Sequence, residues 1–325
     1  MIISHKHLLT LCGIKGFGPK KIHTIVEYLH DEGFSNLSDR EMCDIISELM
    51  RKKVLKGVRE FDLSTFFLAA EKAKRVLEKT MESGIRMVSR YDESYPKILL
   101  NTVNEEGKEA IPLYLFYRGD LSVASRKSVA IIGTREPSSE GEMASRYFAK
   151  TLAKKGINIV SGLAIGCDTA AHKGAIEVQG TTIAALGGGL DNVYPPENLE
   201  LANAIVETGG LLISEYPIGV ETSPYFLVAR DRLQATLSQA VLVIQTDVDG
   251  GTLHAVKAAS VVGKPIFAVE YKNNLDSKYV GGNQHLIQTR MAKPVTSSPE
   301  DITSIISCME EGQDLQLENS QLSLF

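Results

Sequence analysis

Short apolar runs alternate with amphipathic segments from residue 128 onward. The run at 129–132 stops at Gly133, and the run at 157–160 ends in Ser161 and Gly162. An apolar run of about four to eight residues closed by glycine is typical of a strand buried on both faces of a parallel sheet. On this basis strands are predicted at 129–132, 157–160, 182–186, 211–213, 240–244 and 265–269.

The segments between these strands have the apolar spacing of amphipathic helices. The first ends at Gly156, which suits a C-terminal cap, and Asp168 is placed to start the next helix. Regular alternation of strand and helix predicts an α/β fold: a doubly wound, mostly parallel Rossmann-like sheet with helices on both faces. The predicted helices lie at 141–155, 168–178, 198–207, 225–236 and 252–262.

Residues 1–80 have helical periodicity throughout and differ from the rest. Residues 14–22, IKGFGPKKI, have the pattern of a hairpin between two helices, and Pro19 suits the first position of the second helix. The hairpin resembles a helix-hairpin-helix element, with Lys15, Lys20 and Lys21 adding charge for DNA; a plain αα-hairpin with solvated lysines explains it equally well. We expect a small helical domain at 1–80, a Rossmann-like domain at 81–310 and a flexible acidic tail at 311–325.

Composition places the chain among ordinary globular proteins. Of its 325 residues 43% are hydrophobic and 23% charged, and no apolar run reaches the length of a membrane span. The N-terminal segment lacks the apolar core of a signal peptide, and the four cysteines have no CxxC spacing. We therefore expect a cytoplasmic protein with free thiols and no membrane association. No cluster of histidines and cysteines suggests a metal site.

The negative net charge of the chain is a weak argument against nucleic-acid binding, because much of it lies in the C-terminal tail. The chain carries a formal charge of −5, but residues 309–325 contain four acidic and no basic side chains. The remainder is therefore close to neutral, and a basic face on the α/β domain is compatible with the composition.

Arg135 follows the first predicted strand of the α/β domain, where a phosphate could bind. Ligands of open α/β sheets bind beyond the carboxyl ends of the strands, and glycines such as Gly162 and Gly166 allow a phosphate to approach the backbone. Unpaired amides at a helix start add partial positive charge, and an arginine can hold a phosphate through two donors. The alternative is that the glycines only form tight turns and that Arg135 is a solvated surface residue.

No complete catalytic or nucleotide-binding motif is present. The first strand–helix turn reads GTREPSS, which excludes the fingerprint G-x-G-x-x-G, and the phosphate loop and the G-x-S-x-G elbow are also absent. Cys167 and His172 would not share one helix face, which favours a packed cysteine and a structural histidine over a nucleophilic pair. Glu215, at a strand end, could act as a base or orient an arginine. We expect no enzymatic activity and no cofactor.

Several motifs occur in a fixed order along the α/β region. They are Gly133-Thr-Arg135, Ser161-Gly-Leu-Ala164 with Gly166 and Asp168, Ala171-His172, Ser214-Glu-Tyr-Pro217, and Arg230-x-Arg232 with Leu237-Ser238. Together they resemble the DNA-processing protein A family (DprA, also called Smf), over about residues 85–290 and in the helical N-terminal region. The resemblance implies a Rossmann-like domain that binds single-stranded DNA, a homodimer, and delivery of DNA to the RecA recombinase during transformation or repair.

The resemblance also indicates which residues contact DNA. Arg135, Gly162 and the 230–232 region would line a phosphate pocket, and we add Lys173 as a neighbouring contact. Tyr216 or Tyr225 could stack on a base. The predicted set is Gly133, Thr134, Arg135, Ser161, Gly162, Gly166, Lys173, Arg230 and Arg232.

The chain departs from the family pattern near this predicted site. Where the family has Phe-Pro-x-Arg-Asn-Arg, residues 227–232 read LVARDR, so Asp231 either places a negative charge beside the phosphate or pairs with a neighbouring arginine. An alternative function is a nucleotide sensor or a phosphoribohydrolase similar to the LOG family. The Pro-Gly-Gly-x-Gly-Thr motif of that family is matched only in part at 249–252, and His254 and Lys257 follow where that family has a glutamate.

The last five residues resemble the pentapeptide by which proteins bind the bacterial β sliding clamp. They are Gln321, Leu322, Ser323, Leu324 and Phe325. Burial of one Leu or Phe side chain is worth roughly 1.5–3 kcal/mol, which is enough for a short peptide with several such anchors to dock. We expect binding to the clamp; the alternative is a tail that folds back on its own domain or pairs in the dimer.

Overall fold

The computed structural model describes residues 2–58, 61–271 and 276–309. These residues form two compact units. The first holds the chain up to Tyr95 together with Leu113–Leu115, and the second holds Pro96–Pro112 and the chain from Phe116 onward. None of the helices in the described ranges is long and apolar enough to cross a membrane. The domain boundaries expected from the sequence stay predictions.

The first unit is mainly helical. Its helices are capped by side chains at their starts: Ser4 accepts from the His7 amide, and Ser38 and Glu41 form a reciprocal capping box. Pro19 occupies the first turn of its helix, as predicted. The elements are α1 (His5–Cys12), α2 (Pro19–Asp31), α3 (Asp39–Arg51), α4 (Leu63–Glu82) and the strand β1 (Arg86–Ser89).

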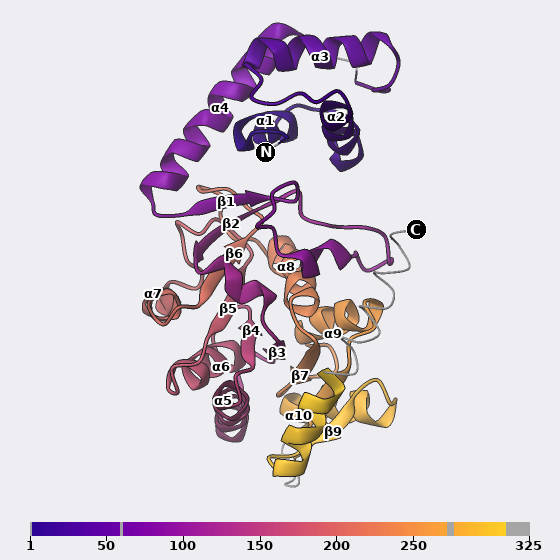
Figure 1. Cartoon of the computed structure of the whole chain (residues 1–325). Coiled ribbons are helices and arrows are strands. Elements are labelled where there is room, and N and C mark those ends of the chain that lie inside the picture. Colours follow the sequence, from indigo (N-terminus) through magenta and orange to yellow (C-terminus); the bar gives the residue numbers. More distant parts are fainter. Residues whose placement is uncertain (1, 59–60, 272–275, 310–325) are drawn as a thin grey trace. The chain divides into compact units, whose positions relative to one another are not determined.

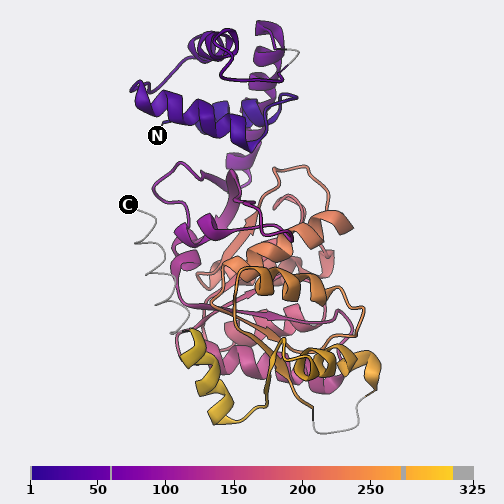
Figure 2. The ribbon, with the colours of Figure 1, turned by 90° about the vertical axis from the view of Figure 1, so that its right-hand side faces the viewer.

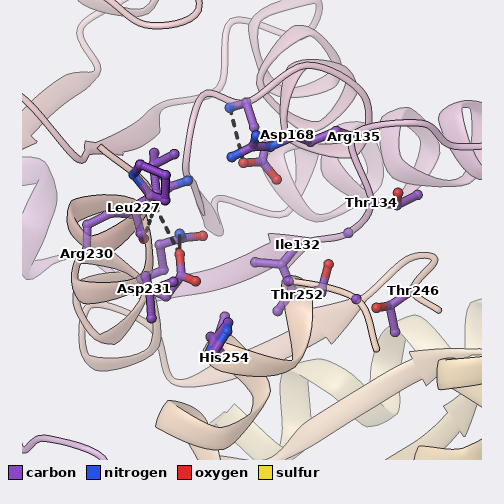
Figure 3. A pocket seen from close by; sticks show the side chains of 18 of the residues that line it. Ile132, Thr134, Arg135, Asp168, Leu227, Arg230, Asp231, Thr246, Thr252 and His254 are labelled. Atoms are coloured by element: carbon purple, nitrogen blue, oxygen red, sulfur yellow. Dashed lines mark hydrogen bonds and ion pairs between the residues drawn. The ribbon is translucent and has the colours of Figure 1, made fainter. Parts of the chain in front are cut away.

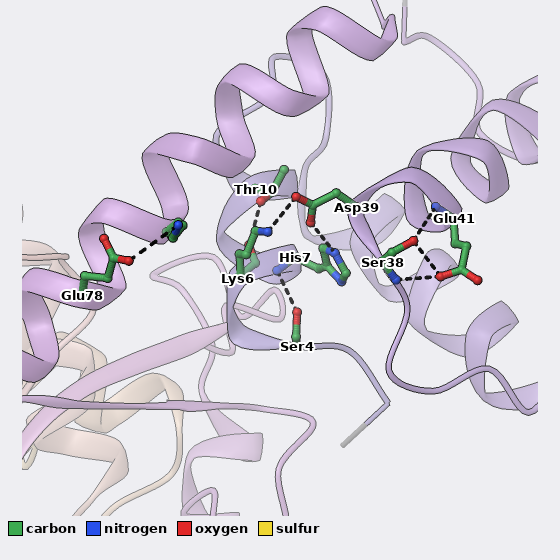
Figure 4. A network of polar contacts seen from close by, with 9 residues as sticks. Ser4, Lys6, His7, Thr10, Ser38, Asp39, Glu41 and Glu78 are labelled. Carbon is green, nitrogen blue, oxygen red and sulfur yellow. Dashed lines mark hydrogen bonds and ion pairs between the residues drawn. The ribbon is translucent and has the colours of Figure 1, made fainter.

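A half-buried polar network connects α1 to the start of α3 (Figure 4). The Lys6 ammonium donates to one oxygen of the Asp39 carboxylate at 2.6 Å, and the His7 ring lies 3.0 Å from the other. Burial lowers the pKa of His7, although the hydrogen bond to Asp39 acts in the opposite direction. Asp39 stands in the first turn of α3, where its charge also favours the helix dipole.

The predicted hairpin lies between α1 and α2. Ile14 and Phe17 are buried, and Gly16 has a φ of 96°, which a residue with a side chain rarely adopts. The Lys21 ammonium donates to the Gly16 carbonyl at 2.6 Å, so this lysine closes the hairpin, while Lys15 is exposed. The helix-hairpin-helix interpretation stays a prediction.

The second unit contains a twisted, mostly parallel sheet, which confirms the predicted α/β fold. Its strands run in the order β2-β6-β5-β4-β3-β7-β8-β9, and only the β2–β6 pair among them is antiparallel. The strands are β2 (Tyr114–Gly119), β3 (Ser128–Ile132), β4 (Asn158–Ser161), β5 (Thr182–Leu186), β6 (Leu211–Ser214), β7 (Ala240–Val243), β8 (Ile266–Val269) and β9 (Lys293–Val295).

Helices cover both faces of this sheet (Figure 1). The first three α-helices of the unit lie on one face and the next ones on the other, and α8 and α9 lie side by side in both views (Figures 1 and 2). The helices are α5 (Ser139–Lys154), α6 (Cys167–Ile176), α7 (Leu199–Glu207), α8 (Pro224–Thr236), α9 (Thr252–Val261) and α10 (Ser277–Gln288), with short 3₁₀ segments η1 (Lys97–Asn101), η2 (Leu121–Ser125) and η3 (Pro196–Asn198).

The order of the strands reverses beside β3. From β3 the chain proceeds through β4 and β5 to β6 on one side, and then returns to place β7 on the other side of β3. The loops that leave β3 and β7 therefore lead to helices on opposite faces. This arrangement leaves a crevice between the two strand ends, which is where open α/β sheets bind ligands.

The sequence did not predict α10 and β9. The segment of α10 contains Gly281 and Gly282 and has no clear apolar periodicity, and β9 has three residues, one of them Pro294. Both depend on tertiary contacts. The buried side chain of Asn283 in α10 illustrates this. Its oxygen accepts from the backbone amide of Thr246 at 2.9 Å. Its nitrogen donates to the Ile244 carbonyl at 2.8 Å and to the Val269 carbonyl at 3.0 Å.

Substitution Asn283→Ala should destabilise the second unit. It would leave one buried amide and two buried carbonyls without their partner, and we expect a loss of about 2–4 kcal/mol in the free energy of unfolding. Chemical denaturation measures this change. The control is Asn104→Ala, because the Asn104 side chain also accepts two backbone amides but in an exposed turn. Equal losses in the two variants would contradict the role assigned to Asn283.

Candidate nucleic-acid interface

A cavity of about 670 Å³ opens beyond the carboxyl ends of β3 and β7 (Figure 3). Its walls come from the loops after β3, β4 and β5, from the first turn of α6, from one side of α8, and from the loop after β7 with the start of α9. The two strand ends are held together by hydrogen bonds between Ile132 and Ile244 and between Thr134 and Gln245. The cavity therefore has a rigid floor at the point where the strand order reverses.

Arg135 stands at the mouth of this cavity. Its side chain is exposed, and in the described parts of the chain no carboxylate lies within ion-pair distance of its guanidinium. The backbone beside it is fixed, since the Thr134 amide donates to the Gln245 carbonyl at 2.8 Å and the Cys167 amide to the Thr134 carbonyl at 3.2 Å. A fixed loop thus presents an arginine that is available for an anion.

Asp168 does not act as the sequence predicts. Helix α6 begins at Cys167 with Gly166 as its N-cap, so the prediction that Asp168 caps the helix start is wrong. Its buried carboxylate instead accepts from the amides of Gly162 and Ala164, both at 3.2 Å. These two amides are therefore engaged within the protein and are not available to a phosphate.

The guanidinium of Arg230 is buried beside the cavity. It donates to the Ala185 carbonyl at 2.6 Å, and its Nε lies 3.0 Å from the Asp231 carboxylate. A Cβ added at Gly162 would lie 1.8 Å from the Arg230 Nη1, so this position accommodates the guanidinium only as glycine. Burial raises the pKa of Asp168, and the charge of Arg230 acts in the opposite direction.

The structure brings only part of the predicted site together. Gly133, Thr134, Arg135 and Arg230 line the cavity. A smaller hollow adjoins it and is lined by Arg135, Gly162, Ala164, Ile165, Tyr194, Pro195, Leu227 and Arg230; we call it the side hollow.

The other predicted residues lie outside both spaces. Ser161 is buried and its hydroxyl donates to the Ile131 carbonyl at 2.7 Å, which joins β4 to β3. Gly166 has a φ of 79° at the start of α6, and Lys173 is exposed on that helix. The Arg232 guanidinium lies 2.6 Å from the Glu215 carboxylate, which confirms that Glu215 orients an arginine.

Cys167 and His172 are packed in the interior. Burial raises the pKa of the Cys167 thiol to about 12, and burial lowers the pKa of His172 to about 3. The His172 ring lies 2.7 Å from the Thr182 hydroxyl. Both residues are therefore structural, as the sequence indicates, and neither lines the cavity.

Sequence reasoning missed much of the wall formed by α8 and α9. This wall includes Gln234, Thr252 and His254, which come from two helices packed side by side. Asp231 was noted only as a departure from the family pattern, and the structure confirms that it pairs with an arginine, Arg230. Burial raises the pKa of Asp231 to about 6, against the opposing charge of Arg230.

The two tyrosines proposed for base stacking differ in their surroundings. The Tyr216 ring packs on the Phe226 ring, with the centroids 4.1 Å apart. Tyr225 is 76% exposed but lines neither the cavity nor the side hollow. Tyr194, which the sequence analysis did not single out, lines both spaces and is 47% exposed.

Asp231→Asn should change how stability depends on pH. Because the folded pKa of about 6 lies above the value near 4 of an unfolded aspartate, the folded protein binds this proton more tightly. The stabilisation is complete below about pH 4 and is lost as the pH rises through about 6. Relative to Asp231→Asn, the parent chain should lose on the order of 2 kcal/mol between pH 4 and pH 7.

Urea unfolding at several pH values measures this difference. Asp44→Asn, which alters an exposed carboxylate paired with Arg40, is the control. Parallel stability profiles for the parent chain and Asp231→Asn would show that the pKa of Asp231 is the same in the folded and the unfolded chain, and would contradict the raised value.

Comparisons with known proteins agree with this geometry. The family described as DNA recombination-mediator protein A matches residues 86–307. Protein Smf of Escherichia coli is 35% identical over 213 residues, which cover 62% of this chain and 55% of that protein. The chain thus spans little more than half the length of that relative.

Two solved structures extend the match to the fold. The X-ray structure of DNA processing protein A from Streptococcus pneumoniae superposes with a TM-score of 0.70 at 28% identity, covering 94% of this chain and 98% of that one. The DNA processing protein A of Helicobacter pylori, described for its single-stranded DNA binding mode, gives a TM-score of 0.58 at 26% identity, covering 70% and 96%. The resemblance seen in the sequence is confirmed: the chain belongs to the DNA recombination-mediator protein A family, which includes DprA and Smf.

Proposed function

We propose that this protein binds single-stranded DNA across the carboxyl edge of its sheet and acts as a recombination mediator. The observation that carries the proposal is Arg135, an exposed arginine without an acidic partner in the described chain, held at the mouth of a cavity by a fixed loop. The Helicobacter pylori relative, which is described as a single-stranded DNA-binding protein, supports the choice of ligand.

Binding would use phosphates more than base edges. Arg135 offers a planar set of donors that fits a phosphate, whereas Arg230 and Arg232 are already engaged with Asp231 and Glu215. A site with few phosphate contacts on a nearly neutral domain should bind weakly at high salt and more tightly as the salt concentration falls. Affinity would therefore be electrostatic and tolerant of sequence.

We infer from the family resemblance that the protein works as a homodimer and delivers the bound strand to a RecA-type recombinase, in DNA uptake or in repair. We infer also that it does so without catalysing a reaction. The side chains most suited to catalysis support this, because the Cys167 thiol is buried with a raised pKa and Glu215 is paired with Arg232.

A nucleotide sensor or a phosphoribohydrolase is the second candidate. It is favoured by the volume of the cavity, about 670 Å³, which lies in the range of small-molecule sites. The start of α9 also lines the cavity and has neither a side-chain cap nor an acidic residue in its first turn. Incubation with AMP and an assay for released base separates this candidate from DNA binding.

Arg135→Ala should weaken binding of oligo-dT and reduce its salt dependence. Each phosphate contact that is lost lowers the slope of log affinity against log salt by about 0.7 for a single strand. Fluorescence anisotropy at several salt concentrations measures both quantities. Arg146→Ala is the matched control, because Arg146 also lies on the second unit but pairs with Glu177. An unchanged slope and affinity for Arg135→Ala would remove Arg135 from the DNA site.

We propose further that residues 321–325 bind the β sliding clamp. They lie outside the described residues, and the proposal rests on their resemblance to the clamp-binding pentapeptide. Replacing Leu324 and Phe325 by alanine should abolish binding in a titration with purified clamp, since both apolar anchors are lost. The control replaces Leu315 and Leu317, which lie in the same tail outside the pentapeptide. Equal binding by the two double variants would refute the proposal.

A further inference from the structure

Two large apolar side chains are exposed beside Arg135. Ile165 is 44% exposed and Tyr194 is 47% exposed, and both line the side hollow together with Arg135. A single exposed apolar side chain is ordinary, but an aromatic ring, an aliphatic side chain and an arginine without an acidic partner around one hollow are not. This combination of an arginine with an aromatic ring is the one that proteins use to hold single strands.

The loop that carries Tyr194 is fixed to the turn that carries Ile165. The neighbouring Val193 is buried, and the side-chain nitrogen Nδ2 of Asn198 donates to the Leu163 carbonyl at 2.8 Å. The Asn198 oxygen also accepts from the hydroxyl of Thr169 in α6 at 3.2 Å. The two exposed side chains are therefore presented by one connected piece of backbone, which reduces the entropy lost when a ligand binds.

The turn that carries Ile165 contains an unusual backbone conformation. Leu163 is fully buried and has a φ of 65°, which a residue other than glycine rarely adopts. Such a conformation persists only when its surroundings determine it, and it is most common at binding sites. Here Asn198 on one side and the amides bound by Asp168 on the other hold the turn in place.

We propose that Tyr194 and Ile165 form a base-stacking platform, on which one unpaired nucleobase lies while Arg135 binds an adjoining phosphate. This rests on the proposed function and names residues that carry it. A stacking platform accepts every base, because each has a π-face, and it requires that the face is not covered by a paired neighbour. The platform therefore gives the site its preference for single strands over duplex.

Stacking and phosphate binding have different salt dependence, which allows them to be separated. Tyr194→Ala should weaken oligo-dT binding about tenfold at every salt concentration and leave the log–log slope unchanged. Tyr194→Phe should bind as the parent chain does, because the ring remains. A strand of the same length whose sugars carry no bases should bind equally to the parent chain and to Tyr194→Ala.

A fluorescent reporter tests the contact directly. The chain contains no tryptophan, so Tyr194→Trp introduces a single one at the platform. Its emission should be quenched when oligo-dT binds and should remain unchanged with the strand that lacks bases. Met143→Trp is the control, because Met143 is an exposed residue of α5 outside both the cavity and the side hollow, and its emission should not respond.

Each result decides between specific alternatives. If anisotropy reports bound oligo-dT while the emission of the Tyr194→Trp variant is not quenched, the platform is overturned and the proposed function is left intact. A change of slope in Tyr194→Ala would also overturn it, because the residue would then act through phosphates. If the parent chain binds no single strand at low salt, the proposed function fails and the platform fails with it.

Discussion

The candidate site depends on the interactions of one buried group, the guanidinium of Arg230. Removing a charge from water is costly, and the cost is offset here by the carbonyl of Ala185 and the carboxylate of Asp231. The absence of a side chain at Gly162 provides the space. The same charge favours the ionised form of Asp168, which holds the turn after β4 through two amides. A single side chain thus links α8, β5 and the turn beside which Arg135 stands.

Three arginines were predicted for one DNA site, and the structure assigns them to three environments. Arg135 is exposed without an acidic partner in the described chain, Arg230 is buried, and Arg232 is paired with Glu215. In the sequence, nothing in residue type or spacing distinguishes one of these three arginines from the others. Only burial and the identity of the nearest acceptor, which depend on the packed fold, distinguish an arginine that can bind a ligand from one that supports the structure.

Much of the fold was predictable because its signal is local. The strands β3 to β8 are short apolar runs closed by glycine or polar residues, and Gly156, with a φ of 78°, follows the last residues of α5 as expected. The position of Arg135 beside the cavity could be predicted because the residue follows a strand end. The α8–α9 wall, Tyr194 and the role of Asp168 could not, since each depends on segments that meet only in the folded chain. Helix α10 was not predictable because polar contacts such as those of Asn283 hold it in place, and its sequence lacks the apolar periodicity of an amphipathic helix.

Strand β7 is late in the sequence but central in the sheet, between β3 and β8. During synthesis β3, β4, β5 and β6 emerge first, and β3 is then an apolar strand with one open edge. That edge can pair with another chain until β7 arrives and covers it. The loop that bears Arg135 gains its anchor, the carbonyl of Gln245, at the same moment. A nascent chain would therefore be most prone to aggregate just before the loop of Arg135 is anchored, so the completion of the sheet and the completion of the cavity beside Arg135 are one event in its biogenesis.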